Sequence, residues 1–158
     1  MICKGVIFED FVNYKVPCMT IEMPVCKNFK CDKECGRAIC QNGPLANAKL
    51  YNYSNEAIIA TYHLNPIVKA LCFQGLEPFD TFCDMYVLIK DFRQESYDDV
   101  VIYTGYNEDE ISEQVEQLKQ FKNIIIKFGR YVPDQDSVID EVLGVKLASP
   151  NQYARRIS

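Results

Sequence analysis

Four cysteines lie within fifteen residues of one another, at Cys26, Cys31, Cys35 and Cys40. Thiolates in a short segment suit a soft metal centre, either a zinc ion or an iron–sulfur cluster. The intervals between these cysteines hold four, three and four residues, and the chain has only one histidine, His63. Because structural zinc sites usually combine two C-x2-4-C knuckles, this spacing favours a cluster held by three thiolates, and zinc stays the alternative.

The whole composition bounds the class of protein. A chain of 158 residues with 48% hydrophobic and 25% charged residues can bury a core, so we expect one domain over residues 1–158. The formal net charge of -5 disfavours a nucleic-acid partner, since no basic face offsets the phosphate charge. No apolar run is long enough to span a membrane, so we expect no membrane partner.

The start of the chain indicates the redox compartment. Its first fifteen residues lack the long apolar stretch and small-residue cleavage site of a signal peptide, which predicts a cytoplasmic protein with reduced thiols. A disulfide framework is therefore disfavoured. A thiol redox pair at Cys31 and Cys35 would lack the C-x-x-C spacing. The remaining cysteines, at 3, 18, 72 and 83, are predicted to be small buried side chains.

Strand and helix patterns alternate along the chain. Alternating or compact apolar runs predict strands at 18–25, 67–73, 100–104 and 123–128, and 3.6-residue periodicity predicts helices at 54–63, 80–92 and 108–121. Ser54 is a candidate N-cap, and Asp80 could cap the second helix. The C-terminal stretch from residue 144 is polar and predicted to be irregular, either a tail or a strap across the site.

This alternation predicts an α/β fold with a mostly parallel sheet. Ligands bind such sheets at the carboxyl ends of the strands. Four segments each follow a predicted strand directly. They are the cysteine segment (from Cys26 to about Asn42), the loop at 75–78, Thr104-Gly105 and Gly129-Arg130. We therefore expect them to lie along one rim.

Several segments, in order, carry a family resemblance. Gln74-Gly75-Leu76-Glu77-Pro78 resembles the Gly-Gly-Glu/Asp-Pro motif of the radical S-adenosylmethionine (SAM) superfamily. The runs VVIYTGYNEDEI, IIIKFGRY and ASPNQYARRI are similar to segments of anaerobic ribonucleotide reductase activating proteins, as is the opening run FEDFVNYKVP. The chain thus resembles glycyl-radical-enzyme activases over nearly its whole length.

The resemblance implies a radical SAM-like partial (β/α) barrel and two cofactors, a [4Fe–4S] cluster and SAM. It implies cluster ligands Cys26, Cys31 and Cys40, because Asn28–Cys31 resembles the run before the second ligand and Cys40–Asn42 the run from the third. The set Cys31, Cys35 and Cys40 is the rival, with Cys35 as the alternative ligand.

The resemblance also implies that SAM is bound by Gly75, Glu77, Pro78 and, through its hydroxyl at a strand end, Thr104. The implied activity is reductive cleavage of SAM to a 5′-deoxyadenosyl radical. The implied partners are a low-potential electron donor, flavodoxin or ferredoxin, and a glycyl radical enzyme as protein substrate.

The sequence departs from the family pattern at three places. The usual cysteine spacing is C-x3-C-x2-C, which no three cysteines here reproduce. Leu76 stands where a second glycine is usual, and Lys127-Phe128 replaces an acid and a small residue. These departures leave open a non-catalytic iron–sulfur or zinc module that has kept the fold.

Overall fold

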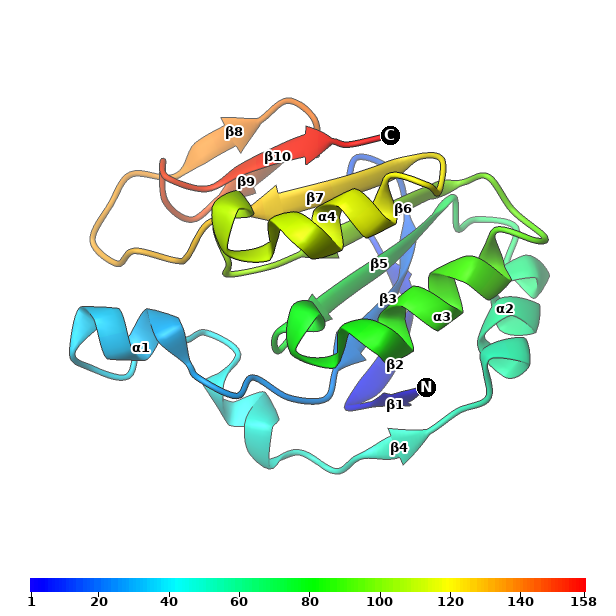
Figure 1. The fold of residues 1–158 in the computed structure, drawn as a ribbon, viewed down its shortest axis with the longest axis horizontal. Helices are drawn as coiled ribbons and strands as arrows, with labels where there is room; N and C mark the ends of the chain where they lie inside the picture. The colour runs from blue at the N-terminus through cyan, green and yellow to red at the C-terminus, as the bar shows by residue number, and fades with distance from the viewer.

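The centre of the protein is a six-stranded sheet with the strand order β10-β7-β6-β5-β3-β2 (Figure 1). The computed structural model describes residues 1–158. The four central strands run parallel, and they are β3 (Cys18–Met23), β5 (Ala70–Gly75), β6 (Asp99–Tyr103) and β7 (Ile124–Phe128). The outer strands β2 (Gly5–Asp10) and β10 (Tyr153–Arg156) are antiparallel to their neighbours. The predicted α/β fold with a mostly parallel sheet is confirmed.

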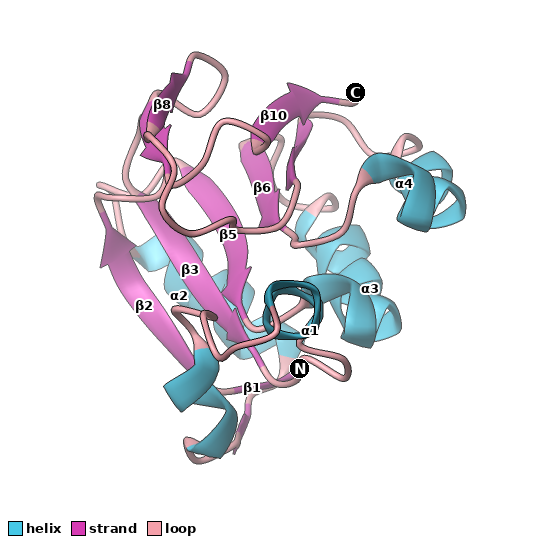
Figure 2. Cartoon of the chain, turned by 90° about the vertical axis from the view of Figure 1, so that its left-hand side faces the viewer, coloured by secondary structure: helices cyan, strands magenta, loops and turns pink.

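Three helices cover one face of this sheet. They are α2 (Asn55–Leu64), α3 (Phe82–Phe92) and α4 (Ser112–Leu118), and Figure 2 shows them behind and to the right of the strands. Their apolar sides join alternate strand residues in a core of 23 buried side chains, including Ile21, Phe73 and Ile126. Successive parallel strands are added in one direction across the sheet, which puts every connecting helix on the same face. The outer strands β2 and β10 do not pair, so the sheet is open and is not a closed barrel.

The opposite face of the sheet, called the inner face below, carries the other alternate side chains. Away from the carboxyl ends of the strands, this face carries a second buried cluster that contains Cys18, Cys72 and Val101. The hairpin of β8 (Val138–Asp140) and β9 (Val145–Leu147) covers this cluster through Leu143 and Leu147. At the carboxyl ends of the strands, the inner face is open and forms a cavity.

The predicted elements agree with the structure where the pattern is local. Ser54 caps α2, accepting a hydrogen bond from the backbone N–H of Ala57 at 3.2 Å. The prediction of a strand at 67–73 is shifted, because pairing with β3 begins at Ala70. The predicted helix at 108–121 is a 3₁₀ turn, Glu108–Ile111, followed by the shorter α4.

Two predictions about local structure are wrong, and one short helix was not predicted. The C-terminal stretch is not irregular: β10 pairs with β7 along the whole strand, which gives a polar segment its backbone partners. The cysteine segment contains a short helix, α1 (Lys30–Cys35). Asp80 caps no helix, because the side chain of Glu77 accepts the hydrogen bond that caps the 3₁₀ turn Pro78–Thr81 before α3.

Short elements complete the chain. The strands β1 (Ile2–Cys3) and β4 (Tyr51–Asn52) pair with each other, and a 3₁₀ turn spans Gly43–Asn47. All eight cysteines are free thiols. Cys3, Cys18 and Cys72 are buried as predicted, but Cys83 is exposed on α3, so its predicted burial is wrong.

No helix of the protein combines the length and the apolar character that crossing a membrane requires.

Candidate metal centre

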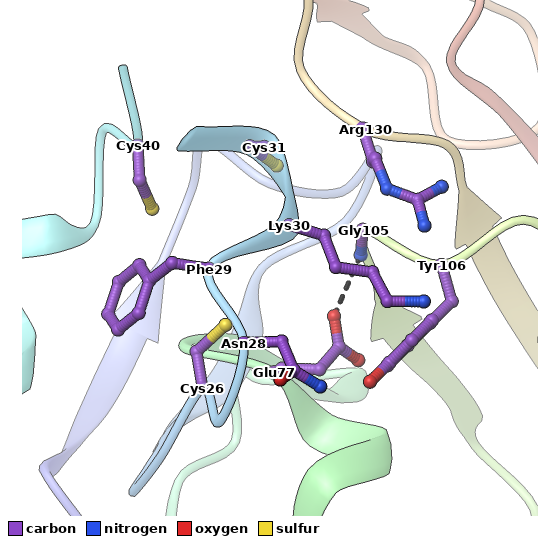
Figure 3. A pocket seen from close by; sticks show the side chains of 10 residues that line it. All are labelled: Cys26, Asn28, Phe29, Lys30, Cys31, Cys40, Glu77, Gly105, Tyr106 and Arg130. Carbon is purple, nitrogen blue, oxygen red and sulfur yellow. Dashed lines mark hydrogen bonds between the residues drawn. The ribbon is translucent and has the colours of Figure 1, made fainter. Parts of the chain in front are cut away.

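Three of the four clustered cysteines face the same space. Cys26 follows β3, Cys31 lies in the first turn of α1, and Cys40 precedes the 3₁₀ turn at 43–47. All three line a small cavity of about 40 Å³ and also the larger cavity of about 400 Å³ beside it. Figure 3 shows their side chains around the smaller cavity, with Glu77 and Gly105 across from them. The sequence therefore brings three thiols from separate turns to one rim, as expected.

Cys35, the fourth cysteine of the segment, lines neither cavity. Near it, Arg37 Nη2 donates to Asp134 Oδ2 at 2.9 Å. Between Cys31 and Cys40, Asp32 folds the segment back. Its Oδ1 accepts the backbone N–H groups of Ile39 and Cys40 at 2.8 and 2.7 Å. This turn absorbs the residues between Cys31 and Cys40, although the ligand set itself stays a prediction.

The three facing thiols share one electrostatic environment. Burial raises the pKa of Cys26, Cys31 and Cys40 above the usual thiol value. Backbone N–H groups oppose this shift in each case, from Phe29 towards Cys26 and from Tyr131 towards Cys31. Donors aimed at cysteine sulfur stabilise thiolate, the form that ligates metal. These surroundings fit thiolates once a metal replaces their protons.

The thiols do not converge on one point. No group of three or more His, Cys, Asp or Glu side chains is close enough to hold a single metal ion. Ligands of one zinc ion must all lie about 2.3 Å from it, whereas each ligand of a cluster binds its own iron, so its sulfurs stand further apart. The thiols therefore do not form a preassembled site for a single zinc ion.

Ion pairs hold α1 against the rest of the site. Glu110 Oε1 lies 2.6 Å from Lys30 Nζ and 2.6 Å from Arg130 Nη2, which links α1 to the loops after β6 and β7. Arg130 is 8% exposed at its side chain, and its Nε lies 3.0 Å from Glu34 Oε1 without hydrogen-bond alignment. The hydrogen bond from Arg130 is the main reason that the pKa of Glu110 falls to about 2.

Glu77 joins two rim loops through one buried carboxylate. Its Oε1 accepts hydrogen bonds from Thr104 Oγ1 at 2.7 Å and from the backbone N–H of Phe79 at 3.1 Å. Its Oε2 accepts the backbone N–H of Gly105 at 2.9 Å (Figure 3). Burial raises the pKa of Glu77 to about 7, even though these three donors favour the charged form. A carboxylate has about four acceptor positions, so Oε2 keeps one free.

The neighbours of Glu77 give the loop its shape. Gly75 has φ of +88°, and a Cβ there would approach Leu45 Cδ2 to 2.9 Å. Pro78 is buried at the start of the 3₁₀ turn, where a missing N–H leaves no partner unsatisfied. The carbonyl of Gly75 accepts a hydrogen bond from Asn42 Nδ2 at 2.6 Å, which ties the residues after Cys40 to this loop. The predicted SAM-binding residues Gly75, Glu77 and Thr104 all line the larger cavity, whereas Pro78 does not.

The larger cavity continues over polar side chains of the inner face. Glu22 pairs with Gln74 in the register of β3 and β5, and Tyr103 pairs with Lys127 in that of β6 and β7. All four line the cavity, whose volume of about 400 Å³ falls in the range of ligand pockets, roughly 300–1,000 Å³. Leu76, the residue at the unusual motif position, is 6% exposed and also lines it.

Sequence reasoning assigned no role to several residues that shape this site. Asn151 Nδ2 donates to the carbonyl of Arg130 at 2.7 Å, and Gln152 Nε2 donates to that of Gly129 at 3.4 Å. Gly129 has φ of +91°, and a Cβ there would lie 2.7 Å from the carbonyl oxygen of Asn151. The C-terminal segment thus holds the loop after β7. The run Ser-Pro-Asn-Gln was visible in the sequence, but nothing local indicated what it touches.

Comparison with known proteins gives one match. The family model described as 4Fe-4S single cluster domain matches residues 25–147, most of the chain. The chain therefore belongs to this family, and the match indicates a domain that binds one [4Fe–4S] cluster. The family is found in radical SAM-type proteins. Comparisons with curated proteins and with solved structures returned no match.

Proposed function

We propose that the protein is a radical SAM enzyme of the activase-like type, with a [4Fe–4S] cluster on Cys26, Cys31 and Cys40 and SAM in the adjoining larger cavity. Cys26, Cys31 and Cys40 would hold three irons of the cluster, and the fourth would be available to SAM. A bound, reduced cluster would supply the electron for reductive cleavage of SAM to methionine and a 5′-deoxyadenosyl radical. A low-potential donor, flavodoxin or ferredoxin, supplies that electron.

The observation that carries this proposal is the shared cavity. Cys26, Cys31 and Cys40 line it together with Gly75 and Glu77, two residues of the loop that resembles the SAM-binding motif. In this proposal Glu77 Oε2 uses its free acceptor position for an N–H of the SAM amino group. Thr104 orients that carboxylate through its own hydrogen bond to Oε1. Gly75 keeps the loop backbone close to the ligand.

A non-catalytic iron–sulfur module is the second candidate. Two observations favour it: Glu77 already accepts three hydrogen bonds from the protein, and the Leu76 side chain occupies the rim where a glycine is usual. Such a module would bind the cluster but would not bind SAM in a position where it can be cleaved.

Anaerobic reconstitution with iron and sulfide separates these candidates. The enzyme proposal predicts a four-iron cluster whose reduced EPR spectrum changes when SAM is added, and 5′-deoxyadenosine formed under dithionite. A cluster whose spectrum ignores SAM, with no 5′-deoxyadenosine, would establish the non-catalytic module. A reconstituted sample without a four-iron cluster would remove both candidates.

The ligand set has its own test. Cys26→Ala is expected to lose the cluster after reconstitution, whereas Cys35→Ala keeps wild-type iron and sulfide content, because Cys35 lines neither cavity. The rival set predicts the reverse. Cys83→Ala, an exposed cysteine on α3, is the matched control for losing a thiol elsewhere.

The macromolecular partner remains part of the proposal. A glycyl radical enzyme is the substrate that the activase resemblance implies, and a sheet that does not close into a barrel suits a macromolecular substrate. Incubation of the reduced, SAM-loaded protein with such an enzyme should produce a glycyl radical EPR signal. Uncoupled 5′-deoxyadenosine formation without that signal would argue for another substrate.

A further inference from the structure

Lys127 is a buried lysine at the candidate metal centre. It belongs to β7 and is 6% exposed. Its ammonium group donates to the carbonyl oxygens of Gly129 at 2.7 Å and Thr104 at 3.4 Å. It forms no ion pair with any carboxylate of the chain. A cation in this position therefore has polar contacts but no counter-ion of its own.

Burying such a charge opposes folding. Desolvation lowers the pKa of Lys127 to about 8, which still leaves the ammonium charged at neutral pH. Buried ions are stabilised only when an opposite charge lies near them. A neutral side chain of similar length would avoid this cost, so the presence of lysine points to a negative group in the functional protein.

Negative charge at this place comes from the metal centre. Cys31 and Glu77 are the groups whose charge acts favourably on Lys127, and both line the same cavity. Lys127 in turn is the leading charge that favours the thiolate of Cys31, ahead of Arg130. Glu77 supplies one negative charge without forming an ion pair with Lys127, and a thiolate at Cys31, which faces the cavity, supplies the other.

We propose that Lys127 is the internal counter-ion of the cluster and raises its reduction potential. Three thiolates leave a [4Fe–4S] centre negatively charged, and reduction adds a further negative charge. A fixed cation nearby therefore stabilises the reduced state more than the oxidised state, and low solvent exposure strengthens the effect. Lys127 thus changes the reduction potential of the cluster through its charge, without contact with the substrate. The inference rests on the cysteine ligands of the proposed function but not on SAM cleavage.

The test is a potentiometric titration of the reconstituted, SAM-free protein, followed by the EPR signal of the reduced cluster. Lys127→Met is expected to lower the midpoint potential, and Lys127→Arg to keep it near the wild-type value. Lys146→Met is the matched control, because Lys146 lines the same cavity but is exposed to solvent, which screens its charge. Metal-free Lys127→Met should unfold at a urea concentration equal to or higher than that of the wild type.

A wild-type midpoint potential in Lys127→Met with full cluster content would overturn the proposal, even if SAM bound less tightly. Weaker SAM binding at an unchanged midpoint potential would instead make Lys127 a ligand for the SAM carboxylate. If Lys127→Met and Lys127→Gln both fail to take up the cluster, Lys127→Arg decides: full uptake supports a requirement for charge, and failed uptake overturns it. Formation of 5′-deoxyadenosine in the wild-type sample tests the proposed function separately.

Discussion

At the scale of single residues, one carboxylate connects the pieces of the site. Glu77 caps the 3₁₀ turn before α3 and binds both Thr104 and Gly105 at the end of β6. It is 8% exposed, so its charge is costly, and its three donors only partly offset that cost. Functional carboxylates often combine burial with a raised pKa in this way.

This burial predicts a pH dependence of stability for the metal-free protein. The pKa of Glu77 is about 7 in the folded state, whereas a free glutamate ionises near about 4.3. Between these values the folded state holds a proton that the unfolded chain has released. The contribution of the protonated Glu77 carboxyl to stability is therefore fully present below the pKa that Glu77 has in the unfolded chain. It falls as pH rises towards 7, by at most about 1.4 kcal/mol per pH unit.

Urea unfolding from pH 5 to pH 8 measures this slope. Glu77→Gln should flatten it, because glutamine does not titrate, and should also lower stability by about 1–3 kcal/mol through the unmatched contact with the Gly105 N–H. Glu113→Gln, on the exposed side of α4, is the control that should keep the wild-type slope. An unchanged slope in Glu77→Gln would show that the carboxyl is not buried as described.

At the scale of elements, the rim is held by turns that cross between strands. The loop after β5 contacts the cysteine segment through Asn42 and the start of that segment through the backbone, where the Glu77 N–H donates to the carbonyl of Val25 at 2.9 Å. Gly75 makes this close approach possible, since Leu45 and the backbone of Glu22 fill the space around it.

Gly75→Ala is expected to destabilise the protein by about 1–3 kcal/mol and to reduce cluster content, because φ of +88° is strained for alanine and its Cβ would displace Leu45. Gly43→Ala is the matched control: nothing lies within 4 Å of its Cβ position, and its φ is not in the left-handed region. Equilibrium urea unfolding and iron content measure both variants. Equal losses in the two would mean that the turn geometry at Gly75 is not required.

At the scale of the whole molecule, the core and the metal centre are separate. The two buried clusters draw their side chains from the sheet, the three helices and the β8–β9 hairpin. The helix α1 of the cysteine segment contributes no buried residue. At the proposed ligands the cluster would lie on the rim of a sheet that is stabilised elsewhere, unlike a zinc finger, in which the metal replaces a core.

Removal of the cluster should leave the fold intact. After oxidation and chelation, the far-UV circular dichroism spectrum is expected to stay close to that of the loaded protein. Hydrogen exchange should accelerate in residues 26–47 while β5, β6 and β7 keep their protection. The unmodified loaded protein is the reference. Global loss of protection on removal of iron would mean that the metal centre is part of the folding core.

Sequence reasoning predicted the elements that local interactions define and missed features that depend on contacts between distant residues. Helix α2 and strands β3, β6 and β7 were predicted because capping and apolar periodicity are local signals. The strand β10 was missed because a polar, exposed strand is defined by its partner β7 and not by its own pattern. The exposure of Cys83 was missed because its burial was predicted from apolar neighbours in the sequence and not from its position around the helix.

The sequence by itself determined the chemistry available to this protein: a cysteine segment, the loop around Glu77, and the strand ends that bring them to one rim of a parallel sheet. Only the tertiary structure decided which groups meet. It separated Cys35 from the other three cysteines, used the Glu77 carboxylate as a link between loops, and left Lys127 buried without a carboxylate partner. The reason is physical: residue type and spacing are local properties, whereas burial and charge compensation depend on contacts between residues far apart in the chain.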